Sequence, residues 1–428
     1  MIKIDRLAWR LAGAGLLIRF GLFLRICLEP GLAVKGDSQG YLSIARNLLD
    51  WGLFSSSPQA PFLPETFRTP GYPIFLAALG ALFNDPVLPA IFAQALLGAG
   101  SVILMWLWLE PVWGRRPAVI GTSVLAFDPV LVLHGPMILG ETLYVFLLIA
   151  ACLVFWRERE SAGIKIGASC GLLFSAAAFV RPISLYLPLL LFWFWKKRGR
   201  AGMAFLLGAY LLPAFWIARN YQTTGHSVFS SVAGISLLRY PAAGVEAMAG
   251  KRAWDEVDQE LRDKVDAENP SGYANDAAKS AAYAAAAKPI LLRRPMTLIA
   301  YLSWGMVKML AGTGLEMLSD LFAPGAPAAV EIQFRPQATG QGTLSLLKRR
   351  PWLIPIQILY MAGLAMLYIL AGNGLRVHWQ KQRSEALILG LGMLYFIALS
   401  CNQGYYRYRL PMLPFLAAAA SAGALRRT

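Results

Sequence analysis

The sequence predicts an all-α protein that crosses a membrane many times. Of its 428 residues, 57% are hydrophobic and only 15% are charged, and the mean hydropathy is +0.50. Soluble domains carry about 25% charged residues. Many of the apolar runs approach the roughly 20 residues that a helix needs to cross a bilayer. A soluble protein with a single membrane tail is therefore excluded.

Short basic clusters separate the apolar runs and account for much of the net charge of +16. These clusters are Lys3/Arg6/Arg10, Arg115/Arg116, Arg157/Arg159, Lys196/Lys197/Arg198/Arg200, Arg376/Lys381/Arg383 and Arg426/Arg427. Their placement is typical of cytoplasmic loops in membrane proteins. A basic face interleaved with aromatic residues is lacking, so no nucleic-acid partner is expected. The pattern places the N-terminus and the C-terminus inside.

The first span covers about residues 11–28 and contains Arg19 and Arg25. It lacks a small-residue cleavage site, so we interpret it as a retained span rather than a signal peptide. Arg19 lies near the middle of this span, where an arginine needs a partner. No partner for Arg19 can be identified from the sequence.

Residues 29–85 then form the first outer loop. Apolar residues recur at helical spacing over 38–49, with polar residues opposite, which predicts a helix lying in the membrane interface. The apolar run 71–83 is too short to span, so a second interfacial or re-entrant helix is expected there.

The remaining spans are placed so that each basic cluster lies on the inner side of the membrane. They are predicted at about 87–109, 118–133, 141–156, 164–180, 183–195, 201–217, 352–371, 384–400 and 409–425. Residues 296–311 either cross the membrane or lie in the interface, and 312–345 shows no clear element. The total is ten or eleven spans.

Three regions result. Residues 1–219 form a seven-span module, and residues 296–428 form a C-terminal membrane region. Between them, residues 220–295 hold nine of the 24 acidic residues, all between Glu246 and Asp276. Two helices, at about 252–268 and 273–289, are predicted in this segment. It is expected to be a small soluble insert on the outer side.

Under this topology the notable polar residues meet at one outer boundary. They are Asp37 and Arg68 in the first loop, His134, Glu141 and Arg181 at later turns, Arg219 and Asn220 after the seventh span, and Arg407, Tyr408 and Arg409 before the last. The planar guanidinium of arginine can donate two hydrogen bonds to a phosphate. Two carboxylates and several arginines therefore predict a site for an anionic substrate carried on a lipid.

Each of these residues also has a purely structural interpretation. Asp37 could cap the helix that follows it, and Glu141 could complement the dipole of its helix. Arg68, Arg181 and Arg219 could reach lipid headgroups. A divalent metal held by Asp37, Glu141 and His134 stays open, although three scattered ligands are a weak signal.

Six motifs along the chain resemble those of the GT-C membrane glycosyltransferases that use polyprenyl- or dolichyl-phosphate sugars. They are Gly36-Asp37 with Tyr41, Arg68-Thr-Pro-Gly-Tyr-Pro73, Gly140-Glu-Thr-Leu143, Arg181-Pro182, Trp216-Ile-Ala-Arg-Asn220 and Tyr408-Arg-Leu-Pro411. The resemblance is to the bacterial branch related to protein O-mannosyltransferases and lipid A aminoarabinose transferases. It implies a GT-C-like bundle.

The resemblance also implies roles for these residues. Asp37 corresponds to the catalytic base of the first loop, and Glu141 to the second acidic position, which is also expected to be catalytic. The expected ligands of the donor, its phosphate or sugar, are Arg68, Tyr41, Arg181, Arg219, Asn220, Arg407, Tyr408 and Arg409. The larger members have a big C-terminal soluble domain that this chain lacks, which puts a protein acceptor in doubt.

The expected activity is inverting transfer of a hexose or pentose from a polyprenyl-phosphate donor. The acceptor would be a glycan or glycolipid on the periplasmic side of a bacterial inner membrane, or a protein. Such a donor brings its own anionic leaving group, so the enzyme needs a base and phosphate ligands. Two alternatives stay open, a transporter or flippase of lipid-linked sugars and an O-antigen ligase or polymerase.

Overall fold

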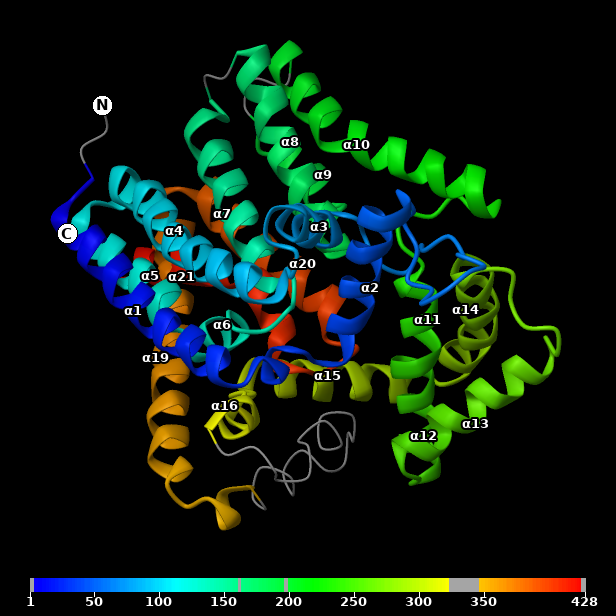
Figure 1. Ribbon diagram of the computed structural model, residues 1–428. Coiled ribbons are helices and arrows are strands. Elements are labelled where there is room, and N and C mark those ends of the chain that lie inside the picture. The colour runs from blue at the N-terminus through cyan, green and yellow to red at the C-terminus, as the bar shows by residue number, and fades with distance from the viewer. Residues whose placement is uncertain (1–3, 161–162, 196–198, 323–345, 425–428) are drawn as a thin grey trace.

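The computed structural model is a bundle of α-helices, shown in Figure 1. It describes residues 4–160, 163–195, 199–322 and 346–424, and no strand occurs among them. The predicted all-α class is therefore confirmed. The basic residues at 196–198 and 426–427, and most of the segment 312–345, lie outside the described residues.

The N-terminal part holds both predicted helices of the first loop. Helix α1 (Arg6–Leu28) and the short helix η1 (Pro30–Ala33) lead into α2 (Gly36–Trp51) and α3 (Gly71–Phe83). Then follow α4 (Val87–Trp113), α5 (Arg115–Phe127), α6 (Pro129–His134), α7 (Glu141–Glu158), α8 (Ile164–Val180), η2 (Pro182–Ser184), α9 (Leu187–Phe192) and α10 (Arg200–Thr224). Helix α3 packs on α2, and α10 packs along α8.

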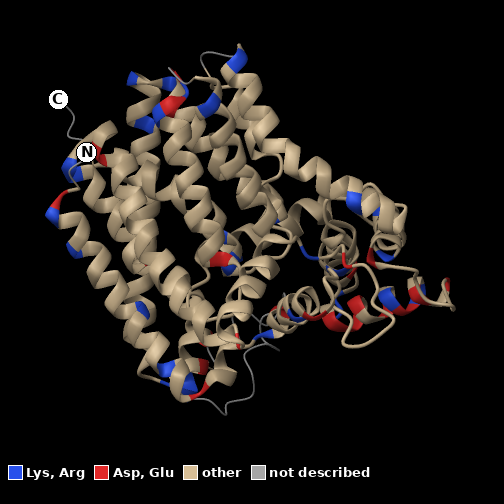
Figure 2. Cartoon of the chain, turned by 45° about the horizontal axis from the view of Figure 1, so that its top comes forward, with Lys and Arg blue, Asp and Glu red and all other residues tan. Residues whose placement is uncertain are grey.

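The chain is a multi-pass membrane protein with fewer long apolar helices than predicted. Within the described residues six helical stretches are long and apolar enough to cross a membrane: α1, α4, α5 with α6, α10, α19 (Leu353–Lys381) and α20 (Arg383–Ser400). The bent pair α15 (Pro295–Ala311) and α16 (Leu315–Phe322) would make a seventh. In Figure 2 the charged residues lie mostly near helix ends and on the insert.

The difference from ten or eleven spans has local causes. Helix α7 carries charged residues at both ends, and α8 has only 17 residues. The predicted span 183–195 is broken into η2 and α9. The predicted span 409–425 is broken into η4 (Tyr406–Met412) and α21 (Leu413–Gly423). Prolines in both segments lack the N–H group that a continuous helix requires.

The insert forms its own small helical cluster. It contains α11 (Val232–Leu237), the π-helix η3 (Leu238–Ala242), α12 (Ala243–Gly250), α13 (Trp254–Ala267) and α14 (Asp276–Arg293). Helices α13 and α14 confirm the two predicted helices, whereas the first three elements were not predicted. Leu238, Val265 and Tyr283 are buried together as its core.

The last helix anchors the C-terminal region to the bundle. Every residue of α21 is buried, and the helix packs against α19 and α5. The preceding turn η4 packs against α6, α7, α15 and α20. The Tyr405–Arg409 motif therefore sits on a rigid base close to the ends of several helices.

Arg19 finds its partners in the backbone of α5. Its guanidinium donates to the carbonyl oxygens of Ala126 and Leu125, both at 3.0 Å, and to Gly15. The chain turns at Asp128-Pro129 after α5, which leaves carbonyls at that helix end without intrahelical partners. The buried arginine thus supplies hydrogen-bond donors to carbonyl groups at the break between α5 and α6, and its role is structural.

Gly98 makes room for this arginine. A Cβ atom at position 98 would lie 2.4 Å from Nε of Arg19. We expect Gly98→Ala to destabilise the protein by about 1–3 kcal/mol through overpacking. Gly13→Ala is the control, because a Cβ there meets nothing within 4 Å. Thermal unfolding in detergent should separate the two variants, and equal midpoints would contradict this packing.

Candidate active site

Asp37 lies in the first turn of α2 and does not cap it. The cap position is Lys35, whose backbone N–H donates to the Ser38 hydroxyl at 2.9 Å. Ser38 in turn donates to the carbonyl of Ile138, which fixes the start of α2. The Asp37 carboxylate accepts instead from Nη2 of Arg407 at 2.8 Å, across 370 positions of sequence. The capping interpretation of Asp37 therefore fails.

Asp37 and Arg407 line a pocket of about 260 Å³. Its charged lining comprises Lys35, Asp37, Arg239, Lys308, Asp320 and Arg407, and its aromatic lining comprises Phe67, Tyr240, Trp254, Tyr301, Tyr405 and Tyr408. Cations outnumber carboxylates in this lining, so the pocket favours an anion. Nε of Arg407 is buried and has no hydrogen-bond partner among the described residues. It is a donor available to a ligand.

Glu141 and Arg181 form a buried pair that does not line the pocket. Oε1 of Glu141 accepts from Nη1 of Arg181 at 2.7 Å. The Arg181 guanidinium lies 5.6 Å from the ring centroid of Tyr408, and that of Arg407 lies 5.1 Å from the same centroid. Tyr408 therefore connects the buried pair to the pocket.

Tyr41 of α2 and Arg68 of the first loop lie side by side. The Arg68 guanidinium lies 5.4 Å from the Tyr41 ring centroid and 3.7 Å from the Glu65 carboxylate. Tyr41 packs edge-on against Tyr72 at 5.0 Å. Burial, followed by the charge of Asp37, raises the pKa of Tyr41 to about 12, so its hydroxyl is neutral at pH 7. Neither Tyr41 nor Arg68 lines the pocket.

Three further residues that were predicted to bind the sugar donor instead donate hydrogen bonds to the protein's own backbone. Arg219 donates to the Glu65 carbonyl at 3.0 Å and to Oδ1 of Asn220 at 2.9 Å. Asn220 donates to the carbonyl of Val228 at 2.9 Å. The buried Arg409 donates to the carbonyls of Leu310 and Gly312 and to the Tyr360 hydroxyl. These contacts hold the first loop and η4 in place.

His134 lines the pocket but does not form a metal centre with the carboxylates. Its Nδ1 lies 2.7 Å from the carbonyl oxygen of Val130, and its ring stands edge-on to Tyr406. Within the residues that the structure describes, no group of three or more His, Cys, Asp or Glu side chains could hold a metal ion. The Asp37, Glu141 and His134 set therefore does not fit a metal site.

The chain is similar to known proteins in part of its sequence and in its fold. Residues 67–218 match the family model described as dolichyl-phosphate-mannose-protein mannosyltransferase. The apo oligosaccharyltransferase of Archaeoglobus fulgidus superposes with a TM-score of 0.51 at 12% identity, over 97% of this chain and 50% of that chain. The fold is that of the GT-C glycosyltransferases. The resemblance in the sequence is thereby confirmed.

A second solved structure gives a weaker match. The oligosaccharyltransferase AglB of the same organism, in complex with an inhibitory peptide and a dolichol-phosphate, has a TM-score of 0.47 at 11% identity, over 97% of this chain and 50% of that one. This chain spans about half the length of these solved structures. No curated protein matches it.

Several residues of the pocket were not predicted. Lys308 is a single cation within the apolar helix α15, and Asp320 in α16 lies 3.5 Å from Nζ of Lys35. A lone lysine in an apolar run is the signal that could have pointed to Lys308. Tyr240 and Trp254 come from the insert, where nothing in the sequence distinguished them from core aromatics.

Asp276, at the start of α14, makes stability depend on pH. Burial, with a contribution from the charge of Glu65, raises its pKa from 3.8 to about 6. Folding therefore favours the protonated carboxyl, and this stabilisation is lost as pH rises through about 6. We expect Asp276→Asn to raise Tm at pH 8 by about 2 °C, with a smaller gain at pH 5. Exposed Asp263→Asn is the control, and a gain independent of pH would contradict the prediction.

Proposed function

We propose that the protein is a membrane glycosyltransferase that transfers a sugar from a polyprenyl-phosphate donor to a glycan or glycolipid. The observation that carries the proposal is the ion pair of Asp37 with Arg407 in a pocket rich in cations. The matching family is described by a dolichyl-phosphate-linked mannose donor, which supports a donor of this class. The proposed location is the bacterial inner membrane, with the pocket facing the periplasm.

Asp37 acts as the general base in this proposal. Its carboxylate takes the proton of the acceptor hydroxyl as the acceptor oxygen bonds to the anomeric carbon. The bond between that carbon and the phosphate oxygen breaks, and its electron pair leaves with polyprenyl phosphate. This single displacement inverts the anomeric configuration. No general acid is required, because the leaving group is already anionic.

Arg407 is proposed to bind the phosphate of the sugar donor, and this contact releases the Asp37 carboxylate from its ion pair. In the structure its Nη2 is held by Asp37, while its buried Nε points to no partner within the described chain. A phosphate that takes over this guanidinium frees the carboxylate to accept a proton. The same contact stabilises the charge that develops on the leaving phosphate. Lys308 adds a further positive charge to the pocket wall.

The other predicted residues support this centre. Glu141 is proposed to fix Arg181 against the ring of Tyr408. The Tyr408 hydroxyl accepts a hydrogen bond of 3.2 Å from Arg407 and is proposed to orient that arginine. Arg68 and Tyr41 are proposed to hold the start of α2. Arg219, Asn220 and Arg409 are proposed to fix the loops that frame the pocket, because their side chains bind backbone carbonyls.

Reconstitution tests the donor class. Protein in lipid vesicles receives polyprenyl-monophosphate sugars carrying a radiolabel, together with an envelope glycolipid extract. We expect the label to enter the glycolipid as polyprenyl monophosphate is released. In a parallel reaction supplied with a polyprenyl-diphosphate-linked glycan, release of polyprenyl diphosphate would favour a ligase or polymerase. Movement of the intact donor across the bilayer without release would favour a transporter.

A further inference from the structure

The pocket wall contributed by the insert contains a π-helical turn. Residues Leu238–Ala242 form the π-helix η3, which includes Pro241. π-Helical turns are rare in proteins, and those that occur are often found at functional sites. This turn carries Arg239 and Tyr240, and both side chains line the pocket. The insert therefore contributes directly to the site rather than standing apart from it.

Tyr240 stacks on a buried tryptophan. Its ring centroid lies 5.9 Å from that of Trp254, and the two planes differ by only 14°. Trp254 begins α13 and packs with Ala243, Ala247 and Val257. The tyrosine is half-buried, whereas the tryptophan is 6% exposed. The two rings form an aromatic platform, with Trp254 as its base.

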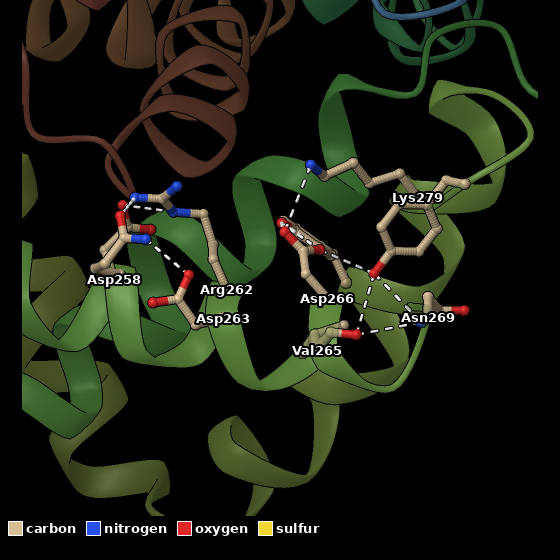
Figure 3. A network of polar contacts seen from close by, with 10 residues as sticks. Asp258, Arg262, Asp263, Val265, Asp266, Asn269 and Lys279 are labelled. Atoms are coloured by element: carbon tan, nitrogen blue, oxygen red, sulfur yellow. Dashed lines mark hydrogen bonds and ion pairs between the residues drawn. The ribbon is translucent and has the colours of Figure 1, made fainter. Parts of the chain in front are cut away.

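A network of charged residues holds this platform in place. Asp258 of α13 is buried and accepts from Nη2 of Arg239 at 3.5 Å and from Nε of Arg262 at 3.2 Å. Figure 3 shows Arg262 turned toward Asp258 on α13. Because Arg239 belongs to η3, its ion pair ties the π-helical turn to the helix that carries Trp254. The aromatic platform is thus preorganised.

The aromatic platform lies close to the reacting groups. Tyr240 shares the pocket with Asp37, Arg407 and Tyr408. Burial raises the pKa of the Tyr240 hydroxyl, and the charges that act on it include those of Arg407 and Asp37. A ligand on the platform would therefore sit next to the proposed base.

We propose that the Tyr240/Trp254 platform binds a sugar ring of the acceptor and presents its hydroxyl to Asp37. The inference rests on the proposed function and names the acceptor as a glycan. A sugar ring has an apolar face of C–H bonds that matches a flat aromatic ring, while its hydroxyls suit polar groups at the rim. The acceptor is favoured over the donor sugar because the platform belongs to the charged insert, whereas the donor's lipid chain must lie among the apolar helices.

The test compares variants of Tyr240 in the vesicle assay. Tyr240→Leu keeps an apolar side chain but removes the flat ring, and we expect it to raise the KM for the acceptor glycolipid about tenfold. The KM for the polyprenyl-phosphate sugar should change much less. Tyr240→Phe keeps the ring and should retain the wild-type acceptor KM. Tyr221→Ala, an exposed tyrosine at the end of α10, is the matched control.

The outcomes separate the two proposals. If wild type releases polyprenyl phosphate and Tyr240→Leu keeps the acceptor KM, the acceptor platform is overturned while the proposed function stands. A rise in the donor KM alone would also overturn it, by assigning the ring to the donor sugar. If wild type releases no polyprenyl phosphate from any donor, the proposed function fails and the inference fails with it. Equal unfolding midpoints of the variants ensure that folded protein is compared.

Discussion

Asp37→Asn is expected to slow sugar transfer by about 10²–10⁴-fold, the usual contribution of a general base. The amide has nearly the shape of the carboxylate but cannot take the acceptor proton. The variant should fold normally, because the Asp37 side chain is 44% exposed and caps no helix. Loss of this carboxylate also frees the Arg407 guanidinium, so the KM for the donor should stay the same or fall.

The measurement is a set of initial rates at varied donor and acceptor concentrations. Asp50→Asn, an exposed aspartate in the same helix, is the matched control and should behave like wild type. A transfer rate of Asp37→Asn equal to that of wild type would remove Asp37 as the base. Glu141→Gln would then be the next variant to assay, since Glu141 is the other acidic residue that the sequence predicts to be catalytic.

Arg407→Ala is expected to lower kcat/KM for the polyprenyl-phosphate sugar by about 10²–10³-fold. This is the usual cost of losing one preorganised hydrogen-bond donor at a developing negative charge. Its effect should differ from that of Asp37→Asn, because the donor KM rises. Arg407→Lys should recover part of the activity, since an ammonium keeps the charge but not the planar fork.

Inhibition by free polyprenyl phosphate provides a second readout for this arginine. Arg407→Ala should weaken that inhibition in parallel with the loss of kcat/KM, whereas Arg46→Ala, an exposed arginine on α2, should change neither. Unchanged inhibition in Arg407→Ala would show that the phosphate binds elsewhere in the pocket, with Lys308 as the first candidate.

The sequence was sufficient to predict most helices and the central residues of the site. Periodicity and charge located the two helices of the first loop, since amphipathic spacing depends on local sequence. Asp37 and Arg407 were each singled out as polar residues at a predicted membrane boundary. Their direct pairing could not be predicted, because it depends on how η4 packs against helices distant in sequence.

Other features depend on backbone geometry that residue patterns do not encode. The partners of Arg19 are carbonyl groups at the end of α5, which any residue type could supply. The π-helical turn that carries Tyr240 into the pocket has no sequence signature beyond Pro241. Span lengths were overestimated where prolines divide an apolar run, as in the segments 183–195 and 409–425.

The anomeric configuration of the transferred sugar tests the central claim most directly. NMR of the glycolipid product, made from a polyprenyl-phosphate donor of defined anomer, reports both transfer and stereochemistry. We expect the configuration to be inverted, because Asp37 removes a proton and forms no bond to the sugar. A retained configuration would contradict the account, since it would require a covalent intermediate on a carboxylate.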